Sequence, residues 1–277
     1  MTPDYAWGDR PVALIRGAGD LASGVAVRLW RSGFAVVMTE VASPTVVRRT
    51  VAFAEAVYEG HAKVEDIEGL RTSSVDEMES AVARGAIPVV VDPNADVRRV
   101  LRPDLLVDAV MAKRNLGTCI DDAPAVVALG PGFTAGRDAD AVIETMRGHD
   151  LGRVIYCGAA APNTGIPGEI AGYAARRVLR SPVKGEFIAT ARIGDMVSAA
   201  DIVGYVGKTP VKSEIHGLLR GLLHSGLPVQ AGHKLGDVDP RAQTAHCYSI
   251  SDKAMAIAGG VLEAACLLLG GVRFSAL

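Results

Sequence analysis

Residues 12–22 read VALIRGAGDLA, and this segment is the clearest indication of the fold of the first half of the chain. An apolar strand ends at Arg16, and a glycine turn leads directly into an amphipathic helix that begins near Asp20. Glycines at such a junction permit a tight turn and let a diphosphate approach the helix N-terminus. The sequence therefore predicts a turn of the dinucleotide-binding type. A purely structural tight turn is the competing interpretation.

Outward from this turn, short β-branched runs alternate with helical stretches from residue 11 to about residue 158. Continuous apolar runs are typical of strands that helices cover on both faces. The pattern predicts an α/β fold with a Rossmann-like, doubly wound parallel sheet. The expected strands are residues 11–16, 35–40, 87–92, 105–111, 125–130 and 153–157, and the expected helices are residues 21–33, 73–85 and 138–147.

Several polar and glycine residues are expected at the carboxyl edge of this sheet, where open α/β sheets bind ligands. Glu40 ends the second strand, 21 residues after Gly19, at the place of an acid that binds ribose hydroxyls. A second glycine-rich turn, residues 130–138, is either an anion-binding turn or a capped helix start. We expect the cofactor-binding residues to be Gly17, Gly19, Asp20, Ala22, Ser23, Gly24, Glu40, Lys113, Arg114, Gly130, Gly132 and Arg137.

No motif in the sequence identifies a catalytic residue. The weak candidates are Lys113, Asp121 and Cys157, of which Asp121 is expected at the same sheet edge and Cys157 is expected to be a buried structural cysteine. The six histidines show no HxxxH or HExxH spacing, and no metal site is expected. Because nucleophile-elbow, Walker and kinase motifs are missing, the common hydrolases and ATPases are excluded.

Near residue 180 the sequence pattern changes to short runs of alternating apolar and polar residues, typical of strands, with frequent glycines. A shift of 32 residues lays Gly194-x-x-Val197 over Gly226-x-x-Val229, and the match continues with residues 203–206 over 235–238. Such a repeat predicts a small β-barrel of two half-motifs, a barrel-sandwich hybrid whose spacing resembles the lipoyl/biotinyl fold. The expected domains are therefore residues 1–180, 181–242 and a C-terminal helical segment, 243–277.

Lys208 is the residue that would bear the prosthetic group if this small domain were a covalent carrier. Lipoyl and biotinyl carriers present a lysine at a hairpin tip in an E-x-M-K or D-K setting. Residues 206–209 read VGKT, which lacks that pattern and looks too short to project a hairpin. We expect no covalent lipoyl or biotin, and a docking or dimerisation role for the domain instead.

Composition excludes several other classes of protein. The chain has 277 residues, 49% of them hydrophobic, and a net charge of −2, which argues against a nucleic-acid module. The N-terminus lacks a secretory apolar region, and the longest apolar run, residues 261–272, is too short to span a membrane. Four cysteines without a CxxC pair suit a reducing compartment. We expect a cytoplasmic protein.

Several long strings resemble the YqeB family, accessory proteins of selenium-dependent molybdenum hydroxylase systems, with distant similarity to XdhC/CoxI-type maturation factors. The strings are GAGDLASGVAVRL, VMTEVASPTVVRRTVAFAEAVYEG, LGPGFTAGRDADAVIETMRGHDLGRVIY, APNTGIPGEI, LRGLL, KLGDVDPR and SDKAMAIAGGVLEA, which lie between residues 11 and 265. The resemblance implies a factor that matures or loads the molybdopterin cofactor of a hydroxylase. Its implied partners are that hydroxylase and a small-molecule cofactor. The apolar C-terminal helix and the truncated barrel favour a homodimer.

Three functions stay open at this point. The leading expectation is a maturation factor that binds molybdopterin cofactor or a nucleotide in the sheet crevice. The competing class is an NAD(P)-dependent oxidoreductase, which the glycine fingerprint favours although no acid/base pair is evident. The third class is a non-catalytic scaffold that recruits the hydroxylase through the small β domain.

Overall fold

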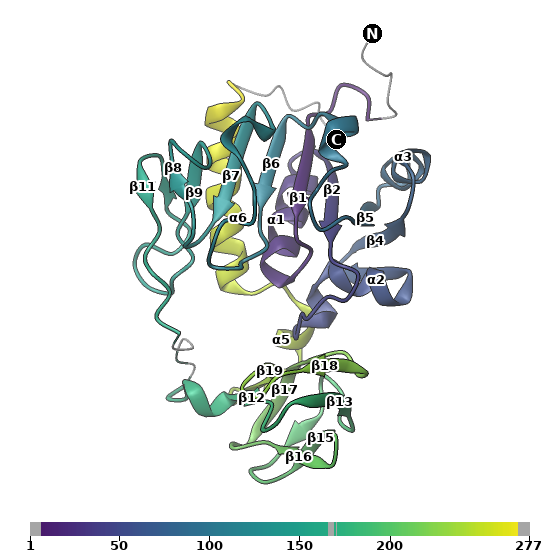
Figure 1. The fold of residues 1–277 in the computed structure, drawn as a ribbon, viewed down its shortest axis with the longest axis vertical. Helices are drawn as coiled ribbons and strands as arrows, with labels where there is room; N and C mark the ends of the chain where they lie inside the picture. Colours follow the sequence, from purple (N-terminus) through teal and green to yellow (C-terminus); the bar gives the residue numbers. More distant parts are fainter. Residues whose placement is uncertain (1–6, 166–168, 170, 271–277) are drawn as a thin grey trace. The chain divides into compact units, whose positions relative to one another are not determined.

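The computed structural model describes residues 7–165, 169 and 171–270 (Figure 1). The N-terminal residues 1–6 and four positions of the APNTGIPGEI string, 166–168 and 170, lie outside them. Two compact units divide the chain: Met1–Pro44, Phe53–Asn163 and Ile250–Leu277 form unit 1, and Thr45–Ala52 with Thr164–Ser249 form unit 2. These borders differ from the expected ones, because unit 2 begins near residue 164 and the C-terminal helix is part of unit 1.

Unit 1 is built on a nine-stranded, mostly parallel sheet, which confirms the expected α/β class. Its strand order is β10-β9-β7-β6-β1-β2-β5-β4-β3, and only the edge strands β10 and β3 run antiparallel to their neighbours. The strands are β1 (Val12–Arg16), β2 (Ala35–Glu40), β3 (His61–Val64), β4 (Ile67–Thr72), β5 (Ile87–Val91), β6 (Leu105–Asp108), β7 (Ala125–Leu129), β9 (Ala141–Ile143) and β10 (Val154–Ile155). A two-stranded ribbon pairs β8 (Thr134–Ala135) with β11 (Gly158–Ala159).

The helix expected over residues 138–147 is absent, and that expectation is wrong. Residues 141–143, AVI, form strand β9 beside β7. All three are fully buried, because the sheet offers this apolar run a parallel pairing partner that a local pattern cannot reveal. The expected strand at 153–157 is likewise only a two-residue antiparallel edge.

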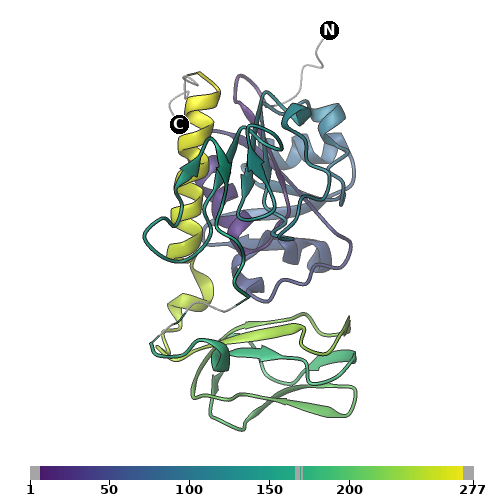
Figure 2. The same cartoon turned by 60° about the vertical axis from the view of Figure 1, so that its left-hand side comes forward.

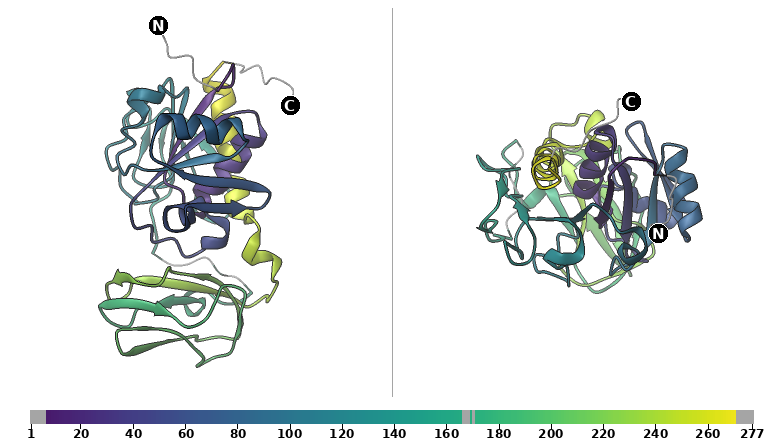
Figure 3. Two further views of the ribbon diagram at one scale, coloured as in Figure 1. Left: turned by 90° about the vertical axis from the view of Figure 1, so that its right-hand side faces the viewer. Right: turned by 90° about the horizontal axis from the view of Figure 1, so that it is seen from above.

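The helices of unit 1 cover the two sheet faces unequally. Helix α1 (Asp20–Arg31) and helix α6 (Asp252–Leu268) lie side by side on one face, where α6 contacts β7, β9 and β10 (Figures 1 and 3). The other face buries Leu14, Val37 and Leu106 under helices α3 (Val75–Ala83) and α4 (Arg98–Leu101) and under loop residues such as Phe133. The remaining helical segments of unit 1 are α2 (Ala56–Glu59), η2 (Phe53–Glu55) and η3 (Ile120–Asp122).

Unit 2 consists of two four-stranded antiparallel sheets, seen as two strand layers in Figure 2. One sheet has the order β12-β19-β17-β14 and the other β16-β15-β13-β18. The strands are β12 (Val178–Arg180), β13 (Gly185–Ala189), β14 (Met196–Val197), β15 (Ile202–Val206), β16 (Thr209–Lys212), β17 (Gly217–Leu222), β18 (Leu227–Val229) and β19 (Lys234–Asp239). Short helical segments η1 (Arg49–Val51), η4 (Ala175–Arg177) and α5 (Ala245–Tyr248) accompany them.

The 32-residue repeat is real and longer than the sequence match. Strands β12 to β15 recur 32 residues later as β16 to β19. The two sheets have equivalent strand orders, and each contains two strands from each repeat: β12 and β14 lie with β17 and β19 in one sheet, and β13 and β15 lie with β16 and β18 in the other. Neither sheet is therefore complete without both repeats.

The expectation that the segment around Lys208 is too short to project a hairpin is wrong. Gly207 and Lys208 form the tight turn of a complete hairpin between β15 and β16, and Lys208 is exposed at its tip. Gly207 has a φ of 59°, which lets two residues close this turn. The segment is thus long enough to present a hairpin, and only the missing flanking pattern still argues against a covalent carrier.

Among the residues that the structure describes, none of the helices combines the length and the apolar character that crossing a membrane requires.

Candidate functional site

A pocket of about 330 Å³ lies at the carboxyl ends of β1, β2 and β5. This is the edge at which open α/β sheets bind ligands, and the volume is at the small end of the range for ligand pockets, about 300–1,000 Å³. It suits one nucleoside-sized group. The lining residues are Arg16, Gly17, Thr39, Glu40, Val41, Asp92, Pro93, Asn94, Val110 and Leu116.

Glu40 closes the glycine turn from the end of the neighbouring strand. Its Oε2 accepts a hydrogen bond from the Ala18 amide at 2.8 Å, and its Oε1 accepts one from the Val41 amide at 2.8 Å. Burial raises the pKa of the Glu40 carboxyl, and these two hydrogen bonds oppose that rise. The Ala18 amide, which an anionic ligand would use, is therefore occupied by a carboxylate.

Apart from Arg16, the other polar groups of the pocket are acidic or neutral. The Oδ2 of Asp92 accepts the Val97 amide at 2.8 Å. Thr39 is fully buried at the end of β2, and its hydroxyl has no hydrogen-bond partner in the described structure. Arg16 is the cation in the lining, and its guanidinium is turned to protein acceptors. The pocket thus favours hydroxyl groups over a bare anion.

The predicted glycines serve close contacts within the protein. A Cβ at Gly17, whose φ is 96°, would lie 3.0 Å from the Ala109 carbonyl oxygen. A Cβ at Gly132 would lie 2.6 Å from the Arg114 Cα. The loops after β1, β6 and β7 are therefore contiguous at the carboxyl edge, as expected, but these contacts explain the glycines without any ligand.

The predicted residues of α1 are also held by the protein. Ser23 is buried, donates its hydroxyl to the Ala18 carbonyl and accepts the Phe53 amide at 2.9 Å. Ala22 is buried inside α1, and a Cβ at Gly24 would lie 2.8 Å from the Ala254 Cβ of α6. Gly19 is the N-cap of α1 with no side-chain cap, and Asp20 is its first residue.

The predicted basic residues do not line the pocket. Lys113 and Arg114 are exposed in the loop after β6, beside Gly132. Arg137 is 72% exposed and pairs with Asp138 at 2.9 Å. Gly130 packs beneath this loop, since a Cβ there would lie 2.5 Å from the Thr145 hydroxyl oxygen and 3.5 Å from the Met111 Cε.

Asp121 is placed away from Glu40. It lines a separate pocket of about 670 Å³ with Pro103 and Pro124, the residues that lead into β6 and β7. The physical reason is direct: a residue that precedes a parallel strand lies at the amino edge, opposite to residues that follow one. Cys157 is exposed at the end of β10, so the expectation of a buried cysteine there is wrong, and Cys247 is the buried one.

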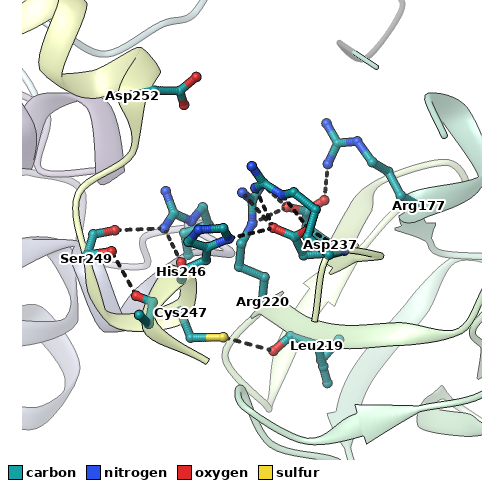
Figure 4. A network of polar contacts seen from close by, with 12 residues as sticks. Arg177, Leu219, Arg220, Asp237, His246, Cys247, Ser249 and Asp252 are labelled. Carbon is teal, nitrogen blue, oxygen red and sulfur yellow. Dashed lines mark hydrogen bonds and ion pairs between the residues drawn. The ribbon is translucent and has the colours of Figure 1, made fainter. Parts of the chain in front are cut away.

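Sequence reasoning missed a network of buried charges in unit 2 (Figure 4). Arg177 and Arg220 converge on Asp237, with the Arg220 Nε 2.9 Å from Asp237 Oδ2. Arg241 donates to both oxygens of the fully buried Asp239, at 2.9 and 2.6 Å. Burial alone would raise the pKa of Asp239, but the bonds from Arg241 and the charge of Arg220 lower it to about 2.

The same network ties distant segments of unit 2 together. Arg48 donates to the carbonyls of His246 and Ser249 at 2.9 and 3.2 Å, and Arg49 donates to the Leu222 carbonyl at 2.8 Å. Cys247 is buried beside the network, its Sγ 3.9 Å from the Leu219 carbonyl, and burial raises the pKa of its thiol (Figure 4). A buried thiol of this kind is inert. We interpret the network as structural.

A signal for these missed residues exists in the sequence. Arg16 and Thr39 are polar residues at the ends of apolar strands, and Arg220, Asp237 and Asp239 interrupt β17 and β19. A buried charge in a strand needs partners, yet the sequence does not show which residues supply them.

Comparison with known proteins gives one informative relative. No family model matches the chain. An aspartoacylase family protein of Mesorhizobium loti shares 12% identity at a TM-score of 0.27, with 84% of this chain and 87% of that one covered. The ectoine utilization protein EutE of Ruegeria pomeroyi shares 13% identity at a TM-score of 0.26, covering 83% and 86%. TM-scores this far below 0.5 do not indicate a function for this chain.

The "Uncharacterized protein YqeB" of Escherichia coli (strain K12) is 52% identical over 270 residues. The match covers 97% of this chain and 50% of that protein, so the chain spans about half the length of the curated relative. By this likeness the chain is a close homologue of YqeB.

Proposed function

We propose that this chain binds a nucleotide, or a nucleotide-bearing cofactor such as the dinucleotide form of molybdopterin, in the Glu40 pocket. In this proposal it acts as an accessory factor in the maturation of a molybdenum hydroxylase. The observation that carries the binding claim is the meeting of Glu40 with the glycine turn: a carboxylate lies 2.8 Å from the Ala18 amide in a pocket at the carboxyl edge.

The pocket chemistry indicates which part of such a ligand it would hold. The Glu40 carboxylate keeps lone pairs for ribose hydroxyls, and Asp92 adds a second acceptor. Negative phosphates would meet Glu40 and Asp92 with no free guanidinium, so they fit better beyond the pocket, toward the uncapped N-terminus of α1 at Gly19. The residues fit the sugar of a dinucleotide, whose pterin end would supply the metal-binding chemistry.

The finer fold is part of this proposal. The β1 to α1 turn, the outward order β6, β7, β9 on one side of β1 and the crevice at the carboxyl edge support a Rossmann-like unit 1. On the other side β5 lies between β2 and β4, which departs from the outward order of that fold. The two half-motifs with exchanged strands support a barrel-sandwich hybrid for unit 2.

Titration calorimetry of the full chain with CTP, CDP, NAD⁺ and NADP⁺ tests the binding claim. We expect at least one 2′-hydroxyl nucleotide to bind and Glu40→Gln to weaken it roughly 10-fold to 100-fold, since a hydrogen bond to a charged group contributes about 1.5–3 kcal/mol. Glu68→Gln is the matched control, because Glu68 is an exposed carboxylate of β4. Absence of nucleotide binding, or equal binding by Glu40→Gln, would refute the proposed site.

The accessory role is tested by measuring hydroxylase activity in cells. In a host that carries the gene and a molybdenum hydroxylase, Glu40→Gln should lower hydroxylase activity while hydroxylase polypeptide remains constant. NADH formation or consumption by the purified chain would favour an oxidoreductase instead.

A further inference from the structure

Arg16 is a buried arginine at the end of β1, 6% exposed, and each of its N–H groups has an acceptor in the protein. Its Nε and Nη2 donate to the Pro93 carbonyl at 3.2 and 3.1 Å. Nη2 also donates to the Leu116 carbonyl at 3.0 Å, and Nη1 reaches the Thr118 hydroxyl at 3.0 Å and Asp108 at 3.4 Å. Arg16 therefore has no donor left for a ligand.

Asp108 and Thr118 complete a buried set around this guanidinium. Asp108 is 2% exposed and Thr118 is 3% exposed. The Thr118 hydroxyl donates to Asp108 Oδ2 at 2.6 Å while it accepts from Arg16, so it bridges the two charges. A buried ion pair is tolerated only when its remaining groups are satisfied, and here the threonine hydroxyl meets that need.

The set joins loops that come from different strands. Pro93 follows β5, and Leu116 lies in the loop after β6. Both line the Glu40 pocket, as do Arg16 itself and Val110, whose amide donates to Asp108 Oδ1 at 3.2 Å. The Arg16 guanidinium therefore bonds both of these walls at once, and its planar shape fixes the direction of its acceptors. The Pro93 wall is also held beside Glu40 by the Asp92 amide, which donates to the Glu40 carbonyl at 3.0 Å.

We propose that Arg16, Asp108 and Thr118 are positioning residues that set the shape and selectivity of the Glu40 pocket. The inference rests on the proposed function, since it concerns the same pocket. Thr118 is not among the lining residues, and its side chain bonds Arg16 and Asp108. Its backbone also bonds the Asn115 side chain, in the turn that carries Leu116. A ligand hydroxyl keeps its geometry to Glu40 only while the opposite walls, Pro93 and Leu116, stay fixed.

The test compares Thr118→Val with Thr118→Ser. Valine has nearly the same shape and lacks the hydroxyl, whereas serine keeps it. Calorimetry with CTP and 2′-deoxy-CTP, or with the best ribonucleotide found and its 2′-deoxy form, gives a ribose selectivity ratio. We expect Thr118→Val to reduce that ratio about tenfold and Thr118→Ser to retain it, with the melting temperature of each variant measured alongside. A stabilising role alone would change the melting temperature and leave the ratio unchanged.

A second measurement needs no variant. Saturating nucleotide should slow amide hydrogen exchange at Thr118 of the wild-type chain, although Thr118 does not line the pocket, and leave residues 61–64 unchanged. An unaltered ratio in Thr118→Val, or unchanged exchange at the Thr118 amide, overturns the positioning role while nucleotide binding stands. Failure of the wild type to bind any nucleotide overturns the proposed function itself.

Discussion

At the scale of single residues, the clearest contrast is between two buried carboxylates. Glu40 lies at a pocket and accepts only backbone amides, so burial dominates and its pKa is raised. Asp239 is surrounded by Arg241 and Arg220, so its pKa falls to about 2 despite burial. A carboxylate whose lone pairs are only partly used by the protein is typical of a binding site. A carboxylate whose oxygens are all bonded by arginine is typical of a structural ion pair.

Asp239 should make stability depend on acidity. Its folded pKa is about 2 against 3.8 normally, so it stabilises the native state above the unfolded pKa. That contribution, on the order of 2 kcal/mol, is lost as the pH falls from near 4 through 2. Urea unfolding between pH 6 and pH 2 measures it.

Asp239→Asn should remove this acid dependence and destabilise the protein by about 1.5–3 kcal/mol, because Arg241 loses its carboxylate partner and the buried Arg220 keeps only Asp237. Glu214→Gln is the control in unit 2, since Glu214 is 65% exposed and lies 3.8 Å from Arg176. It should cost less than about 1 kcal/mol. A stability equal to wild type in Asp239→Asn would contradict the structural interpretation of the network.

At the level of secondary-structure elements, helix α6 covers the part of the sheet formed by β7 and β9, because the connection between these two strands contains no helix. That connection contains only β8 and turns, so the sheet face beside α1 is covered by a helix from the far end of the chain. Close approach depends on small residues: a Cβ at Gly260 would lie 2.2 Å from the Gly152 carbonyl oxygen and 3.1 Å from the Ile143 Cγ2.

Gly260→Ala should therefore destabilise unit 1 by about 1–3 kcal/mol through overpacking. Gly259→Ala is a control in the same helix, because a Cβ there would meet nothing within 4 Å. It should stabilise the protein by up to about 1 kcal/mol, since alanine has the higher helix propensity. Thermal unfolding of both variants measures the difference, and equal melting temperatures would show that α6 is not packed as described.

At the scale of the whole molecule, the chain passes between the two units four times, so neither unit is a continuous segment. Thr45–Ala52, inserted after β2, belongs to unit 2, where the Leu222 amide donates to the Val47 carbonyl at 2.7 Å. Unit 2 also requires both of its repeats, since each sheet contains two strands from each of them.

Unit 2 should carry no covalent prosthetic group. Lys208 is exposed at a hairpin tip, but its neighbours Gly207 and Thr209 do not match the sequence that ligating enzymes recognise in lipoyl or biotinyl carriers. Intact-mass spectrometry of protein purified from its native host should give the mass of the unmodified polypeptide. A lipoyl or biotinyl increment that disappears in Lys208→Arg would contradict this expectation.

The local features of the fold follow from contiguous patterns in the sequence. The strand, turn and helix at residues 12–31, the strand that ends at Glu40 and the 32-residue repeat all depend on contiguous patterns of apolar residues and glycine. Helix α3 also begins as expected, with the Ser74 hydroxyl accepting the Glu77 amide.

Contacts between residues that are distant in sequence depend on the tertiary structure. Residues 141–143 form a strand because β7 is available to pair with them. Asp121 lies at the amino edge because it precedes its strand, and the acceptors of Arg16 lie in two separate loops. The physical reason is common to all three: pairing partners and buried charges are satisfied by groups far away in sequence, and local propensity does not encode them.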